Sequence, residues 1–96
     1  MARVVLASAL SRWLPGASEP IGEVALEVEG ASVGEVLAGL FARHPNLRGY
    51  VVDEHGAVRH HVAVFVDGDA IRDKRNLNQP LGERAEVYVM QALSGG

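Results

Sequence analysis

The last stretch of the chain, residues 84–96, reads RAEVYVMQALSGG and joins an apolar strand to a double glycine. Between Arg84 and Gln91 the valines alternate with larger or charged side chains, which is the two-residue period of a β-strand. Gly95 and Gly96 follow a few residues later and end the chain. Because glycine has no Cβ, such an ending can approach the walls of a narrow channel closely. The stretch therefore predicts a strand followed by an exposed tail that another protein can bind.

Two further strands are predicted near the start of the chain. Residues 3–10, RVVLASAL, are largely apolar on both faces, which is typical of a strand in the middle of a sheet. Residues 23–29, EVALEVE, alternate aliphatic and mostly acidic side chains and predict a half-exposed strand. Residues 11–22 between them carry two prolines and two glycines, which is loop chemistry. We expect these two strands to pair as a hairpin, with the first and the last strand of the chain at the centre of the sheet.

One main helix is predicted after the second strand. Ser32 and Glu35 form a capping box, in which the Ser32 hydroxyl accepts from the Glu35 amide and the Glu35 carboxylate accepts from the Ser32 amide. Pro45 ends the helix near His44. Two internal glycines each cost about 1 kcal/mol, so packing on the sheet must stabilise the helix. Its apolar stripe consists of Val33, Val36, Leu37, Leu40 and Phe41.

The region between the helix and the last strand completes the predicted fold. It contains a long connection with at most one short strand (46–59), a strand (60–66), an Asp-Gly hairpin turn (67–68), a short returning strand (70–72) and a polar loop (73–82) whose Leu77 and Leu81 reach the core. The order β-β-α-β-β-β predicts an α+β fold, a mixed sheet with one main helix packed on one face. We interpret residues 1–92 as one domain and residues 93–96 as a flexible tail.

Composition excludes several classes of protein. The 96 residues are 48% apolar and 22% charged, which is ordinary for a globular domain and unlike a disordered chain. The absence of cysteine excludes disulfides, thiolate metal sites and a cysteine nucleophile, and it fits a reducing compartment. The net charge of −3 gives no basic surplus for nucleic acid, so no nucleic-acid partner is expected. No Ser-His-Asp order or phosphate-binding glycine motif is present.

No membrane segment, secretion signal or metal site is expected. The apolar runs, such as 4–7 and 62–66, fall far short of the roughly 20 residues that a membrane helix needs. The N-terminus lacks the apolar stretch and the cleavage site of a signal peptide, so we expect a cytoplasmic protein without a membrane partner. His60 and His61 are adjacent on a predicted strand and point to opposite faces, so they cannot easily share a metal ion.

Four features occur in a fixed order along the chain. They are a turn from Ser11-Arg12-Trp13 to Gly16, the helix end His44-Pro45, the hairpin from Val64 to Arg72, and the run from Leu81 to Val87 that leads into the last strand and the double glycine. Together they resemble the MoaD/ThiS family of ubiquitin-like sulfur carriers, which have the β-grasp fold. The resemblance covers the whole chain and is nearest to the longer carriers of the CysO type, which supply sulfur for cysteine synthesis.

The resemblance implies a function for the tail. An E1-like enzyme would adenylate Gly96 with its own ATP, and a sulfurtransferase or another sulfur source would convert it to a thiocarboxylate. A sulfur-accepting synthase would then use that sulfur to make cysteine, molybdopterin, a thiazole or a thiolated metabolite. Leu93, Ser94 and Gly95 would thread into the partner's active site. The free carrier would be a monomer without a permanently bound cofactor, and it would be no enzyme, because it contributes no catalytic residue.

Alternation along the strands predicts where a partner docks. We assign the valines of residues 60–66 and 84–91 to the core, because β-branched side chains pack well there. Phe65, Tyr88 and Met90 then lie on the face without a helix, near the tail. An exposed apolar patch of these residue types is typical of an interface. The alternative is that Phe65 or Tyr88 covers the edge of the core or is buried by the polar loop.

Two other functions are compatible with the same residues. The chain could be a ubiquitin-like protein modifier that is conjugated through Gly96 to lysines, and Lys74, its single lysine, would allow few forms of self-linked chain. It could also be a plain β-grasp interaction module whose double glycine arose by chance. Deletion of Gly96 would abolish sulfur transfer and conjugation but would leave the binding of a plain module intact.

Overall fold

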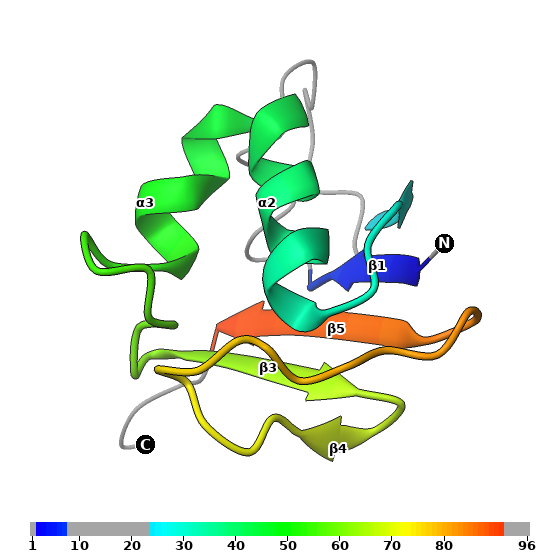
Figure 1. The fold of residues 1–96 in the computed structure, drawn as a ribbon. Helices are drawn as coiled ribbons and strands as arrows, with labels where there is room; N and C mark the ends of the chain where they lie inside the picture. The colour runs from blue at the N-terminus through cyan, green and yellow to red at the C-terminus, as the bar shows by residue number, and fades with distance from the viewer. Residues whose placement is uncertain (1, 8–23, 92–96) are drawn as a thin grey trace.

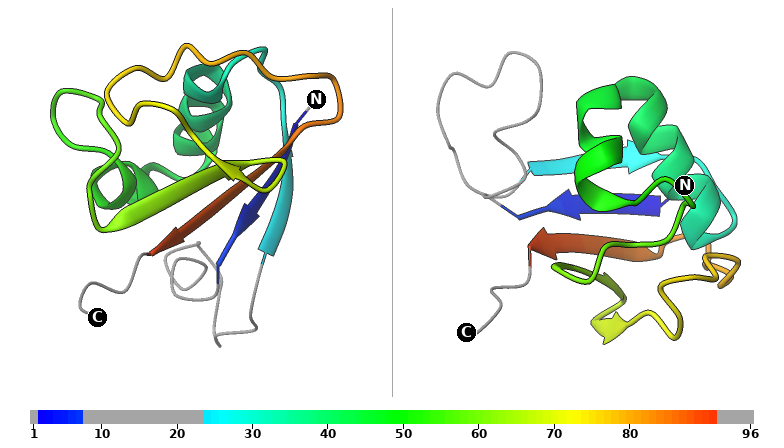
Figure 2. Two further views of the ribbon diagram at one scale, coloured as in Figure 1. Left: turned by 90° about the horizontal axis from the view of Figure 1, so that it is seen from below. Right: turned by 90° about the vertical axis from the view of Figure 1, so that its left-hand side faces the viewer.

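The computed structural model describes residues 2–7 and 24–91, which form a five-stranded sheet with helices on one face (Figures 1 and 2). The strand order is β2-β1-β5-β3-β4. The strands are β1 (Ala2–Leu6), β2 (Val24–Val28), β3 (Val62–Val66), β4 (Asp69–Ala70) and β5 (Glu86–Gln91).

The pairing of the strands confirms the predicted fold class. β1 pairs antiparallel with β2, as the expected hairpin requires, and parallel with β5. β5 pairs antiparallel with β3, which in turn pairs antiparallel with β4. The first and last strands are therefore neighbours, each with a further strand on its other side. A parallel central pair needs a crossover connection, and here the connection carries the helices across one face of the sheet.

Some strand boundaries differ from the sequence prediction. The returning strand β4 covers only Asp69–Ala70, although residues 70–72 were expected. The Ile71 amide still donates to the Val64 carbonyl at 3.0 Å, but a turn at Asp73, whose Oδ1 accepts from the Arg75 amide, leads the chain away from the sheet. The predicted first strand extends to residue 10, and its last three residues, the loop 11–22 and the tail 93–96 lie outside the described residues.

Helix α2 (Val33–Arg43) is the predicted main helix, and its cap differs from the expected one in a single contact. The Glu35 amide donates to Ser32 Oγ at 3.2 Å, as predicted. The Glu35 carboxylate, however, accepts from the Ala31 amide at 3.1 Å and not from that of Ser32. Ser32 is extended and forms a bridge with Pro80, so the carboxylate reaches one residue further back along the chain.

The predicted long connection after Pro45 contains two short helical segments, so that prediction was wrong. They are the 3-10 turn η1 (Pro45–Leu47) and the helix α3 (Arg48–Val51). Leu47 and Val51 are fully buried, and their four-residue spacing places both on the side that packs on the core. The segment is too short for a clear helical pattern in the sequence. Among the described residues no helix is long and apolar enough to span a membrane.

The core lies between the helices and the sheet. The expected all-valine face is buried at Val62, Val64, Val87 and Val89, which are at most 1% exposed, whereas Val66 at the end of β3 is only partly buried. In α2 the predicted stripe is equally buried except for Phe41, which is partly exposed. The polar loop packs Leu77 and Leu81 against the same core, as expected.

Glycine permits the close approach of α2 to the sheet. A Cβ built on Gly39 would lie 2.7 Å from Val28 Cγ1 of β2, which is too close for real carbon atoms. Gly39 weakens α2 because glycine has a low helix propensity, but its lack of a Cβ also lets α2 pack closely on β2. This contact fits the expectation that the sheet stabilises α2.

Candidate functional site

The open face of the sheet carries the three predicted docking residues side by side. Phe65 of β3 is paired with Tyr88 of β5, and the neighbouring pair is Ala63 with Met90. All four side chains are half-buried and lie opposite the buried valines. We call Ala63, Phe65, Tyr88 and Met90 the sheet patch.

The polar loop does not cover this patch. The Gly34 amide donates to the Leu77 carbonyl at 2.7 Å, and the Val33 amide donates to the Gln79 carbonyl at 3.0 Å. These bonds attach the loop to the start of α2, on the helix side of the sheet (Figure 1). On the open side, Val5 is paired with Tyr88 and is only 8% exposed although it is not part of the core cluster. This face is therefore buried at Val5 of β1, and the sheet patch is confined to β3 and β5.

The tail starts from a well-anchored residue. Gln91, the last described residue, is paired with Val62 of β3, and its Oε1 accepts a hydrogen bond of 2.8 Å from the Tyr50 hydroxyl. The ring of His61 meets the ring of Tyr50 edge to face, with 5.7 Å between their centres. The predicted tail residues Leu93, Ser94, Gly95 and Gly96 lie outside the described residues.

Sequence reasoning missed the contact between Tyr50 and Gln91. The two residues are 41 positions apart, and Tyr50 lies in the segment that was interpreted as a connection. Only the packing of α3 against the end of the sheet brings them together. A single sequence holds no signal for such a pair, because neither periodicity nor turn chemistry connects its members.

No metal site is present in the part of the chain that the structure describes, where no three His, Cys, Asp or Glu side chains gather. The rings of His60 and His61 are 6.5 Å apart and nearly perpendicular. Asp53 instead organises its own turn, since its Oδ1 accepts from the amides of His55 at 2.8 Å and Ala57 at 3.0 Å. The Ala57 bond above all lowers the pKa of the Asp53 carboxyl, against an opposing contribution from desolvation, and the His55 bond lowers it further.

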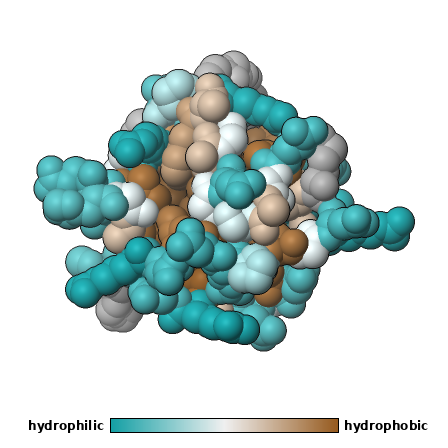
Figure 3. All heavy atoms as spheres, in the orientation of Figure 1, coloured by the Kyte–Doolittle hydropathy of each residue, from teal (hydrophilic) through white to brown (hydrophobic). Residues whose placement is uncertain are grey.

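A second apolar feature lies on the helix side. A groove of about 410 Å³ runs between α2 and α3, and Figure 3 shows apolar surface among polar side chains on this side of the molecule. Its apolar walls come from Leu37, Ala38, Phe41, Val52 and Leu77, and Arg48 stands at its edge.

Comparison with known proteins identifies the family. The sequence model of the ThiS family matches residues 14–96. The chain belongs to the ThiS family. This match extends through the double glycine that the sequence analysis singled out, and it confirms the resemblance to the MoaD/ThiS sulfur carriers. No curated protein matches the chain.

Solved structures of ubiquitin-like carriers and modifiers share the fold. The crystal structure of SAMP1 from Haloferax volcanii is 25% identical, with a TM-score of 0.73 over 99% of this chain and 98% of that one. CysO in the Amycolatopsis orientalis BexX/CysO complex is 20% identical, with a TM-score of 0.74 over 97% and 99%. Mycobacterium tuberculosis CysO is 16% identical, with a TM-score of 0.72 over 94% and 99%. The β-grasp fold is confirmed, and it is the fold of ubiquitin-like sulfur carriers and small modifiers.

Proposed function

We propose that the chain is a sulfur carrier whose reactive group is the carboxylate of Gly96. In the first step a carboxylate oxygen attacks the α-phosphorus of ATP on an E1-like enzyme, and pyrophosphate leaves. In the second step hydrosulfide attacks the acyl carbon and AMP leaves, which gives the thiocarboxylate. If a persulfide is the sulfur source, the acyl disulfide that forms is cleaved by a thiol. The thiocarboxylate then gives its sulfur to an accepting synthase.

The observation that carries this proposal is the family match through Gly96. The geometry at the end of β5 supports it, because the Tyr50 hydroxyl and the pairing with Val62 anchor Gln91. Five residues follow Gln91, and an extended chain of that length spans at most about 17 Å. A partner that docks on the sheet patch can therefore accept the tail in an active site a short distance away. We propose that Phe65, Tyr88 and Met90 dock the partner and that Leu93, Ser94 and Gly95 thread into it.

In this proposal the chain is a co-substrate and not an enzyme. ATP is bound by the activating partner, and the chain itself needs no permanent cofactor. Neither Gly96 nor any other residue of the carrier has to transfer a proton, since the enzyme that receives the tail supplies the chemistry. The lack of cysteine is consistent with this role, because no thiol of the carrier competes for the carried sulfur.

The test is the intact mass of the protein isolated from its native host without acid or reductant. A fraction that is heavier by the difference between sulfur and oxygen, with the change localised to Gly96, is the expected result. The purified chain should also support ATP–pyrophosphate exchange by the E1-like enzyme, and deletion of Gly96 should abolish that exchange. The deletion should leave the unfolding midpoint unchanged, because it removes no residue of the core. An unmodified mass together with no exchange would contradict the proposal.

Conjugation to other proteins is the second candidate function. It is favoured by the match to SAMP1, which is named a small archaeal modifier protein. A modifier would appear as an adduct in which Gly96 forms an amide with a target lysine, whereas a carrier would appear as a free thiocarboxylate. Lys74 is the single lysine, and its Nζ donates to the carbonyls of His60 at 3.3 Å and Arg59 at 3.4 Å. Self-linked chains should therefore be scarce.

A further inference from the structure

A polar pocket lies beside the start of the tail, and most of the charged side chains that line it are positive. The pocket has a volume of about 430 Å³. Its walls carry three cationic side chains, two imidazoles and one carboxylate. We call Arg59, His60, His61, Lys74 and Arg75 the basic pocket, and the carboxylate is that of Asp53.

Backbone contacts hold the two walls of the basic pocket together. The Val58 amide donates to the Lys74 carbonyl at 2.9 Å, which joins the segment after α3 to the start of the polar loop. Lys74 Nζ donates back to the carbonyls of Arg59 and His60. The Arg59 Nε donates to the Gly49 carbonyl at 2.8 Å. The side chains of Lys74 and Arg59 are therefore positioned by neutral carbonyl groups.

No carboxylate in the described part of the chain forms an ion pair with the basic pocket. Among the described residues, the ion pairs within 4.0 Å are Arg3 with Glu86 and His55 with Glu54, and neither includes a member of the basic pocket. The carboxylate of Asp53 accepts from two backbone amides of its own turn and interacts electrostatically with Arg59, so it offsets part of the charge of one of the three cations. Arg75 and His60 are exposed, so their side chains are accessible to a partner.

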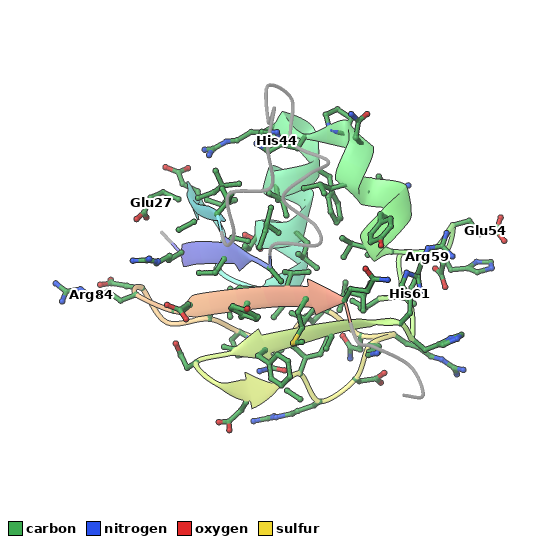
Figure 4. All side chains as sticks on the ribbon, turned by 180° about the vertical axis from the view of Figure 1, so that it is seen from behind. Glu27, His44, Glu54, Arg59, His61 and Arg84 are labelled. Atoms are coloured by element: carbon green, nitrogen blue, oxygen red, sulfur yellow. The ribbon has the colours of Figure 1, made fainter. Side chains whose placement is uncertain are left out.

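The basic pocket lies at the end of the sheet from which the tail departs. His61 precedes Val62, which is paired with Gln91, and its ring contacts Tyr50, which binds Gln91. Figure 4 shows His61 and Arg59 at one end of the sheet and Arg84 at the other. The far end is mainly acidic, since Asp67, Asp69, Glu83 and Glu86 stand there with Arg84 and Arg3.

We infer that the basic pocket docks an acidic protein surface at the mouth of the channel that receives the tail. This inference rests on the proposed function and names the chemistry of the partner. An acidic surface is attracted to the tail end and repelled from the acidic far end, so the charges orient the carrier with its tail toward the channel. The overall charge of −3 makes the orientation selective, because it gives no general attraction to acidic proteins.

The test compares charge changes at the two ends of the sheet. The double variant His60→Glu/Arg75→Glu changes the basic pocket, and Arg84→Glu changes an exposed cation at the far end. Direct binding to the E1-like enzyme of the same genome is measured without ATP, and ATP–pyrophosphate exchange is measured with it. At about 0.1 M salt the double variant should raise the Kd and the KM for the carrier about tenfold while kcat changes less than about twofold. Arg84→Glu should change neither by more than about twofold under the same conditions, because charges beyond about 10 Å are then largely screened.

The other outcomes are also decisive. Equal effects of the double variant and of Arg84→Glu, or no effect of the double variant, would overturn the inference. Inorganic phosphate provides a second probe of the pocket. If millimolar phosphate shifts the NMR resonances of His60 and His61 while the double variant binds the enzyme as the wild type does, the pocket is a small-anion site instead. If the wild-type chain binds the enzyme but supports no ATP–pyrophosphate exchange, the proposed function fails, and binding by the double variant still tests the basic pocket. If the wild-type chain neither binds nor supports exchange, the proposed function and the inference about the pocket both fail. Should the double variant unfold, Arg75→Gln gives the same comparison with a smaller expected effect.

Discussion

The two faces of the sheet use the same strands for different purposes. Val62 and Val64 of β3 point to the helices and are at most 1% exposed, whereas Phe65, their neighbour in the same strand, is partly buried on the face without a helix. In β5, Val87 and Val89 alternate with Tyr88 in the same way. The larger side chains are thus left on the face without a helix. The difference indicates that the valine face stabilises the fold, whereas the proposed docking would use the other face.

The largest expected effect belongs to the buried face. Leu40→Ala removes a fully buried side chain of α2 and should lower the free energy of unfolding by about 2–5 kcal/mol, because it leaves a cavity in the core. Phe41→Ala, which changes the partly exposed neighbour, should cost less. Urea unfolding of both variants measures the difference. Equal losses of stability in the two variants would mean that Phe41 contributes to the core as much as Leu40 does, contrary to its partial exposure.

The second prediction separates stability from recognition within one strand. Phe65→Ala should weaken binding to the activating enzyme about tenfold or more, as expected for an aromatic residue at the centre of an interface, with a smaller loss of stability. Val64→Ala, one residue away on the buried face, should lower stability and leave the affinity of the folded protein unchanged. Titration of the enzyme with each folded variant provides the measurement. If both variants lost affinity equally, the sheet patch would have no special role in docking.

The third prediction concerns the hydrogen bond between Tyr50 and Gln91 at the start of the tail. Tyr50→Phe removes the hydroxyl that donates to Gln91, a hydrogen bond of a kind that contributes about 0.5–1.5 kcal/mol. A double-mutant cycle with Gln91→Ala should give a coupling free energy of that size, read from urea unfolding. Amide exchange at Gln91 should also become faster in Tyr50→Phe. A coupling near zero would show that the pairing with Val62 alone anchors the strand end.

Sequence patterns predicted the two faces well because alternation is a local property. The valines of β3 and β5, the capping residue Ser32 and the hairpin turn each depend on neighbours within a few positions. The helical segments after Pro45 and the bond between Tyr50 and Gln91 depend on packing between distant segments, so they were missed. The basic pocket was missed for the same reason: Arg59 and Arg75 are far apart in the sequence, and the bonds of Lys74 with the segment 58–60 bring them together. The role of Gly96 came from the family resemblance and not from periodicity.

The smallest effect is expected at Asp53, on the wall of the basic pocket. The Ala57 and His55 amides hold the pKa of its carboxyl below the ordinary value of 3.8, so the ionised form favours the folded state. That contribution is present above pH 3.8 and is lost as the pH falls through the lower folded-state value. Asp53→Asn keeps an oxygen that accepts the same bonds but removes the charge. Wild type should therefore be the more stable protein at pH 6, and urea midpoints should converge below pH 3.8. A difference that stayed constant with pH would attribute the effect to the geometry of the turn and not to its charge.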